Sequence, residues 1–123
     1  MKNTIDTTPA PYHVGFLRFD VQLGEPEENL AAVRAGLAKL ALRGSGIIVL
    51  PKLWSCGFAY ERLQHFTLQT VEVLEEMQRL AGQYSIHLAG SLPEEVLTEI
   101  GSAIYNTLYI VGPDGVCGSI RKQ

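Results

Sequence analysis

A charged side chain, Lys52, stands where a wholly apolar segment ends. Ile47-Ile48-Val49-Leu50 is followed by Pro51 and then by this lysine. A cation directly after a buried segment is costly unless it reaches solvent or takes part in chemistry. In open α/β sheets ligands bind beyond the carboxyl ends of the strands, which is where Lys52 is expected. The competing interpretation is structural: the lysine stem covers apolar neighbours while its ammonium group reaches water.

A second candidate for chemistry is Cys56, four residues after Lys52. A nearby ammonium group would lower the pKa of its thiol and make it a better nucleophile. However, no histidine or carboxylate is obviously placed beside it, and small half-buried cysteines are common in such loops. We therefore expect Cys56 to be inert. The minor alternative is a low-activity hydrolase that uses Cys56 as its nucleophile. Cys117 is expected to pack inertly in the final strand.

Other polar and aromatic residues give weaker signals. His13, His65 and His87 lack the paired spacing of metal ligands, and His87 is expected to be a hydrogen-bonded histidine of the core. Trp54 and Phe58 either line a substrate pocket or pack in the core. No motif calls for a cofactor or a metal ion, so we expect neither.

The elements that must position these residues alternate between strand and helix. In order, we expect a strand over 14–21, a helix from Pro26 to a stop at Gly44, a strand over 47–50, a helix over about 67–81, and strands over 86–90, 103–111 and 116–120. A polar loop is expected over 93–102. Gly112-Pro113-Asp114-Gly115 predicts the turn of a hairpin. Strands alternating with helices predict right-handed crossovers and a mainly parallel sheet.

Length and composition exclude several classes of protein. The chain has 123 residues, enough for one domain, and its 46% hydrophobic and 19% charged residues are typical of a globular protein. The net charge of -3 gives no electrostatic reason to expect a nucleic acid or an anionic membrane as partner. The polar N-terminus and two cysteines predict a cytosolic protein. Residues 1–11 are expected to be a flexible leader to a domain over 12–123.

A series of short motifs, in order along the chain, resembles those of the nitrilase superfamily, the carbon–nitrogen hydrolases. The segment Ile47–Trp54 is similar to the family's strand-Pro-Glu-Leu segment. The flanking motifs that agree in order are Phe19-Asp20-Val21 with the Gly24 turn and Glu28-Asn29-Leu30, then Gly90-Ser91-Leu92-Pro93-Glu94, Tyr105-Asn106-Thr107, Gly112-Pro113-Asp114-Gly115 and Arg121-Lys122. The resemblance covers nearly all of the chain from Val14 onward.

The resemblance implies half of an αββα sandwich, with helices on one face of the sheet and a C-terminal β-hairpin. Family members hydrolyse amides or nitriles with a glutamate that moves a proton, a lysine that stabilises negative charge and a cysteine that attacks the substrate. Lys122 matches the family lysine, and Lys52 stands where the general-base glutamate is expected. Asn106 matches a family position and is expected to tie strand and loop by hydrogen bonds.

Two departures from the family pattern predict that this chain alone is inactive. The nucleophilic cysteine corresponds to sequence beyond Gln123, so the chain is expected to be a truncated N-terminal part. An ammonium group at position 52 does not accept a thiol proton, and two neighbouring cations disfavour each other's charged form.

The expected partner of the parent enzyme is a small-molecule amide or nitrile. In this chain alone, an uncovered apolar sheet face is expected to cause self-association or aggregation. The alternative function is a small α/β interaction module that pairs with another chain through that face.

Overall fold

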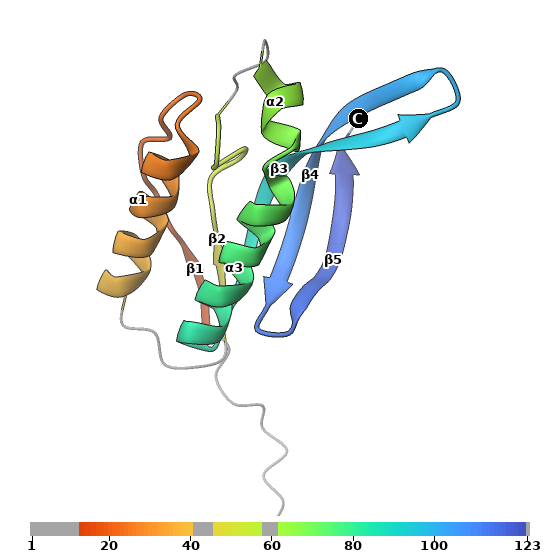
Figure 1. Ribbon diagram of the computed structural model, residues 1–123. Helices are drawn as coiled ribbons and strands as arrows, with labels where there is room; N and C mark the ends of the chain where they lie inside the picture. Colours follow the sequence, from red (N-terminus) through yellow and green to blue (C-terminus); the bar gives the residue numbers. More distant parts are fainter. Residues whose placement is uncertain (1–12, 41–45, 58–61, 123) are drawn as a thin grey trace, which may run out of the picture.

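The chain folds around a five-stranded sheet in which strands adjacent in sequence are also adjacent in space (Figure 1). The computed structural model describes residues 13–40, 46–57 and 62–122, so the expected leader over 1–11 lies outside the described residues. The strands are β1 His13–Phe16, β2 Gly46–Val49, β3 His87–Thr98, β4 Gly101–Gly112 and β5 Gly115–Lys122, and the helices are α1 Pro26–Lys39, α2 Leu63–Thr67 and α3 Thr70–Tyr84.

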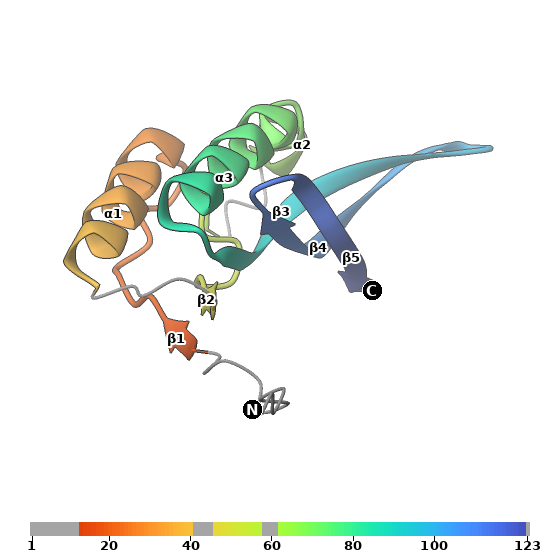
Figure 2. The same cartoon turned by 90° about the horizontal axis from the view of Figure 1, so that it is seen from below.

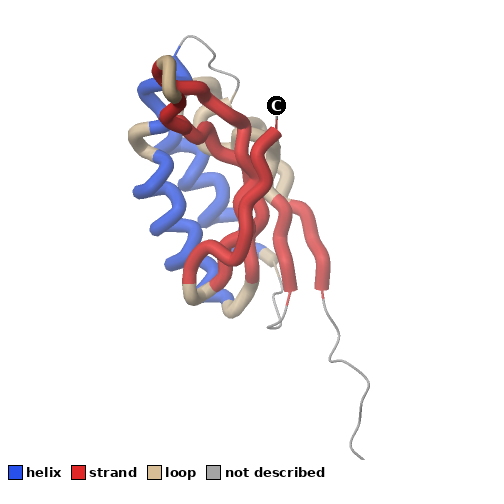
Figure 3. Tube along the Cα trace, turned by 90° about the vertical axis from the view of Figure 1, so that its right-hand side faces the viewer, coloured by secondary structure: helices blue, strands red, loops and turns tan. Residues whose placement is uncertain are grey.

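The sheet is mixed rather than mainly parallel. β1 pairs with β2 and β2 with β3 in parallel, whereas β4 is antiparallel to both β3 and β5. The first crossover contains α1, and the second contains α2 and α3. Figures 2 and 3 show these helices on one face of the sheet. The expected arrangement of helices on one face with a C-terminal hairpin is therefore confirmed, and the parallel part of the sheet ends at β3.

The polar loop expected over 93–102 is wrong, because these residues complete a two-stranded ribbon. β3 and β4 stay paired over nearly their whole length, and the ribbon projects beyond the rest of the sheet (Figure 2). Pro93, Glu94 and Glu95 are poor strand formers, so local propensity hides the strand. Beyond the end of β2, β3 has strand pairing on one side in the described chain, and such an edge tolerates proline.

The helices also differ from expectation at their ends. The helix expected over 67–81 corresponds to α3, inside which Gly82 lies, and the short helix α2 before it was not expected. Helix α3 continues to Ser85, whose left-handed backbone (φ 55°) ends it. The expected stop of the first helix, Gly44, lies outside the described residues, and α1 ends at Lys39. Within the described chain, no helix is long and apolar enough to cross a membrane.

The hydrophobic core lies between the sheet and the two long helices. Its fully buried side chains come from α1, α3, the sheet and the loop after β2, and include Val33, Leu37, Met77, Leu88, Val111 and Trp54. Because these side chains exclude water on the helix side alone, they fix which face of each strand points inward.

The other face of the sheet carries exposed apolar side chains. On β2, Ile48 is buried in the core while Ile47 and Val49 are only half-buried, so the two faces of this apolar strand are not equally covered in this chain. Phe16 pairs with Val49 on that second face and is 70% exposed. Ile120 of β5 is 64% exposed. We call this surface the helix-free face.

Gly90 provides a test of the packing inside the core. A Cβ atom at this position would lie 2.8 Å from Trp54 Cδ1 and 2.9 Å from Trp54 Nε1. We expect Gly90→Ala to lower the free energy of unfolding by about 1–3 kcal/mol, because the buried indole has to move. The control is Gly82→Ala, where nothing lies within 4 Å of the added methyl group. That change should raise the free energy of unfolding by up to about 1 kcal/mol. Urea denaturation measures both, and equal values would contradict the packing.

Candidate functional site

Four strands point their carboxyl ends toward the same edge of the sheet. β1, β2 and β3 are parallel, and β5 runs with β3 because both are antiparallel to β4. Lys52 follows β2 and Lys122 ends β5, so both lysines lie at this edge, and both are exposed. Leu53, next to Lys52, is hydrogen-bonded to Ser91 of β3. Strand β3 lies two strand spacings, or about 10 Å, from β5, which carries Lys122. The fold thus brings the two lysines to one side of the molecule.

The loop that carries Lys52 forms a tight turn. Leu53 has a left-handed backbone (φ 47°), which is rare for a residue with a large side chain. The N–H of Gly57 donates to the carbonyl of Leu53 (2.7 Å), and the N–H of Leu53 donates to Ser91 Oγ (2.8 Å). Leu53 and Trp54 are buried, whereas Lys52 stays at the surface. The turn therefore presents residue 52 to solvent at the end of β2.

The structure buries one of the two cysteines and exposes the other. Cys56 is fully buried, and its thiol donates to the carbonyl of Gly57 (3.3 Å). Burial raises the pKa of Cys56, although a hydrogen bond with Ser55 partly opposes the rise. The lowered pKa on which the nucleophile alternative depended is therefore not found, and burial agrees with the expected inert Cys56, because a neutral buried thiol is a poor nucleophile. Cys117 is exposed rather than packed.

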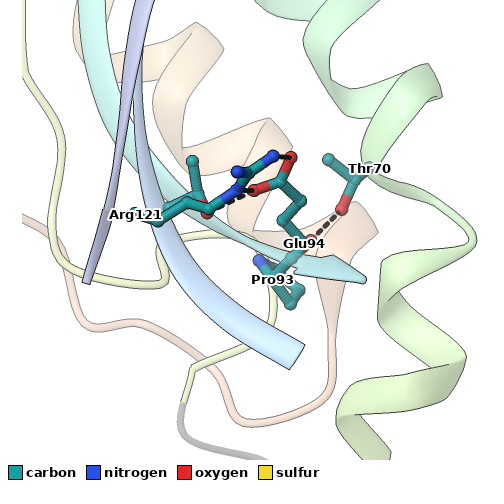
Figure 4. Close-up of polar contacts among 5 residues, drawn as sticks. Thr70, Pro93, Glu94 and Arg121 are labelled. Carbon is teal, nitrogen blue, oxygen red and sulfur yellow. Dashed lines mark hydrogen bonds and ion pairs between the residues drawn. The ribbon is translucent and has the colours of Figure 1, made fainter. Parts of the chain in front are cut away.

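Glu94 makes the main polar contact between β3 and β5, and sequence reasoning gave it no role. Arg121 Nε donates to Glu94 Oε1 (2.7 Å) and Arg121 Nη2 to Oε2 (3.2 Å), as Figure 4 shows. Thr107 Oγ1 also donates to Oε1 (2.8 Å). The hydrogen bond from Arg121 is the main cause that holds the pKa of Glu94 below its usual range. In the sequence, only the two-residue alternation of a strand through residue 94 could have indicated this contact.

The neighbouring hydroxyl of Thr70 fastens the same strand to α3. Thr70 Oγ1 donates to the carbonyl of Pro93 (2.6 Å), and Figure 4 shows this bond beside the Glu94 carboxylate. Thr70 is buried at the first turn of the helix. Thus α3 and β5 are hydrogen-bonded to two adjacent residues of β3, Pro93 and Glu94.

Cross-strand pairing places Lys122 on the face opposite to Arg121. Lys122 pairs with Asn106 and Arg121 with Thr107, and consecutive strand residues point to opposite faces. The final strand thus extends past the expected 116–120 range. Asn106 Oδ1 is buried and has no hydrogen-bond partner among residues 13–40, 46–57 and 62–122. The expectation that it ties strand to loop is therefore wrong for this oxygen.

Two hollows flank the loop after β2. The smaller, of about 290 Å³, is formed by the ends of β1 and β2 and is lined by Phe16, Leu17, Arg18, Phe19, Val49, Leu50 and Pro51. The larger, of about 520 Å³, is a groove between α1 and α3 that Trp54 helps to line. Trp54 is itself fully buried in the core, so the core-packing interpretation holds for it. Phe58 lies outside the described residues.

The three histidines come from different elements: His13 from β1, His65 from α2 and His87 from β3. His87 is half-buried, and a Cβ at Gly112 would lie 2.8 Å from its Nε2 atom, so it packs at the sheet end rather than in the core. Among the residues whose structure is described, no group of three or more His, Cys, Asp or Glu could hold a metal ion.

Comparison with known sequences identifies the family. The family model for carbon–nitrogen hydrolases matches residues 21–123. A nitrilase of Pyrococcus abyssi is 26% identical, and the match covers 89% of this chain and 42% of that protein. The omega-amidase NIT2 of Danio rerio is 30% identical, over 72% of this chain and 31% of its own length. The chain thus spans less than half the length of these relatives.

Solved structures share the fold. A CN-hydrolase superfamily protein of Xanthomonas campestris superposes with a TM-score of 0.71 at 22% identity, covering 87% of this chain and 38% of that one. An amidase from Nesterenkonia sp. has a TM-score of 0.70 at 19% identity, covering 89% of this chain and 41% of that one. At these identities the agreement shows the fold alone.

The contact between Glu94 and Arg121 makes stability depend on pH. A carboxylate with a depressed folded pKa stabilises the fold above its unfolded value of about 4.3, and this contribution is lost as the pH falls through the lower folded pKa. We expect Glu94→Gln to lower the melting temperature by about 3–5 °C at pH 7. The difference should shrink steadily as the pH is lowered toward 3.

The control for this prediction is Glu95→Gln, one residue along β3. Its carboxylate accepts one hydrogen bond from Ser102 at the surface, so little change is expected at either pH. Thermal unfolding by circular dichroism measures both variants. An effect of Glu94→Gln that does not vary with pH would contradict the ionic contribution.

Proposed function

Because the chain belongs to the carbon–nitrogen hydrolase family, we propose that it forms the first part of a domain of the amide- or nitrile-hydrolysing type, with a site that is inactive as it stands. The observation that carries this proposal is the shared edge of the sheet, where Lys52 and Lys122 both lie at carboxyl ends of strands. Open α/β sheets bind ligands at that edge. The proposed substrate is a small amide or nitrile.

Lys122 is the proposed electrostatic group of the site. Its ammonium would stabilise the negative charge that develops on the substrate during attack. Arg121 pairs with Glu94 on the other face of β5, and this contact holds the end of the strand in register. A held strand end reduces the freedom of Lys122, and such preorganisation favours catalysis.

Position 52 is the proposed site of the general base, and its lysine is the reason we propose that the site is inactive. A protonated amine has no free lone pair, so it does not take the proton of a nucleophilic thiol. A carboxylate at the same exposed point would do so. This chemical difference supports inactivity independently of the length of the chain.

The nucleophile of the proposed reaction is neither cysteine of this chain. Cys56 is fully buried. Cys117 lies five residues before Lys122 on β5, or about 16 Å along the strand. We propose that the cysteine comes from sequence beyond residue 123, which would make this chain an incomplete part of the domain. Both cysteines are free thiols, which supports the proposed cytosolic location.

A chimera tests the role of position 52. Residues 13–122 replace the equivalent part of the amidase from Nesterenkonia sp., which supplies the remaining sequence. We expect the chimera with Lys52→Glu to hydrolyse a small aliphatic amide at least about 100-fold faster than the chimera with Lys52, because a positioned base is restored. Ammonia release measures the rate.

The matched control is Lys39→Glu, which makes the same change of charge at an exposed position of α1 and should leave the rate unchanged. Measurable turnover that is equal with Lys52 and with Lys52→Glu would refute the inactivity. A folded Lys52→Glu chimera without activity would refute the hydrolase role of the chain.

A second candidate function is an interaction module that pairs through the helix-free face. Phe16 is 70%, Val14 63% and Ile120 64% exposed, and all three come from strands of the sheet. Apolar strand surface of this kind favours association. The occupant we propose is a second copy of this chain, which presents the same apolar face.

Substitution at Phe16 tests this pairing. We expect the chain to form dimers or larger species at micromolar concentration and Phe16→Lys to shift it toward the monomer, because a buried ammonium would be costly. The control is Val71→Lys on α3, which is 65% exposed but lies on the helix side. Light scattering after size exclusion measures the mass. A wild-type chain that is monomeric at every concentration would count against the pairing.

A further inference from the structure

The loop that carries residue 52 is fastened to the start of α1 by one buried side chain, Asn29. This residue is 0% exposed. Its Nδ2 atom donates to the carbonyl of Ser55 (2.8 Å) and to the carbonyl of Gln22 (2.9 Å). Its Oδ1 atom accepts from the N–H of Gln22 (2.7 Å). One carboxamide therefore joins the segment before α1, the helix itself and the loop after β2.

The pattern of these bonds requires a carboxamide. Both donors point at backbone carbonyls and the acceptor faces a backbone N–H, so neither an aspartate nor a leucine could satisfy all three. The N–H of Gly24 also donates to the carbonyl of Cys56 (2.8 Å), beside the contact of Asn29 with Ser55. The two bonds hold consecutive carbonyls of the loop against the segment before α1.

The loop needs such contacts because its backbone is strained. Leu53 is held with a left-handed φ of 47°, and strained conformations persist only where the surroundings over-determine them. The hydroxyl of Ser91 on β3 accepts a hydrogen bond from the N–H of Leu53 and holds one end of the turn. Asn29 holds the other end at Ser55. Residue 52 precedes the strained residue directly, so its direction depends on both contacts.

We propose that Asn29 is a positioning residue, which fixes where the side chain at position 52 stands relative to Lys122. The inference rests on the proposed function only for the meaning of position 52. The contact itself is tested on the loop, without any hydrolytic assay, so failure of the hydrolase proposal would leave this test unaffected.

Two residues of the loop, Cys56 and Trp54, report its opening. Cys56 is fully buried and should react slowly with a thiol reagent, whereas the exposed Cys117 serves as the reference in the same molecule. In Asn29→Ala we expect the labelling rate of Cys56, relative to Cys117, to rise by about tenfold or more, because buried carbonyls lose their partner. The control is Glu28→Ala, an exposed neighbour on α1, which should leave the ratio unchanged.

Trp54 provides a spectroscopic signature of the same loop. It is the chain's one tryptophan and is fully buried. Its emission should shift to longer wavelength in Asn29→Ala while the far-ultraviolet circular dichroism stays that of the folded chain.

In a second variant, Asn29→Asp, the side-chain volume and the acceptor for Gln22 N–H remain but both donors are lost, so we expect the same opening with less disturbance of packing.

The outcomes separate positioning from general stability. Faster labelling of Cys56 and shifted emission in a folded variant support the proposal. Labelling and emission that match the wild type in either folded variant would overturn it. Loss of the circular dichroism signal in both variants would also overturn it, because Asn29 would then hold the whole domain rather than the loop.

Discussion

The pairing of β5 with β4 places Arg121 and Lys122 on opposite faces of one strand. Arg121 turns to the face of Thr107 and meets the Glu94 carboxylate through two hydrogen bonds. The contact is made across β4, so it ties three strands together in a single register. A slip of one residue would exchange the faces of the two basic side chains. The face on which Lys122 lies depends on this register.

Residue 52 lies at the same edge, but it is placed there by a loop rather than by strand pairing. β2 is only four residues long, and the chain leaves it through a turn with a left-handed leucine. That turn is held from the sheet by Ser91 and from the first helix by Asn29. The proposed site thus combines a strand end, whose position is set by pairing, with a loop, whose position is set by side-chain contacts. Both kinds of contact are needed to bring residues so far apart in sequence to one edge.

A core on one side of the sheet explains the remaining surface. The helices cover one face, and their buried side chains account for the inward residues of β2, β3 and β4. The other face keeps Phe16 and Ile120 exposed. In an αββα sandwich, which the family resemblance implies, a second sheet would lie there. The one-sided core is therefore consistent with a chain that spans less than half the length of its relatives.

Local signals in the sequence determined the parts of the protein that depend on neighbours along the chain. Apolar periodicity and Pro26 indicated α1, the run at 47–50 indicated β2, and Gly112–Gly115 indicated the hairpin turn. The order of motifs also identified the family. Only the tertiary structure decided the contacts of Glu94 and Asn29 and the two-stranded ribbon over 93–102, because pairing and burial override weak local propensity there. Side-chain partners 27 residues apart, such as Glu94 and Arg121, follow from strand register, which no local pattern encodes.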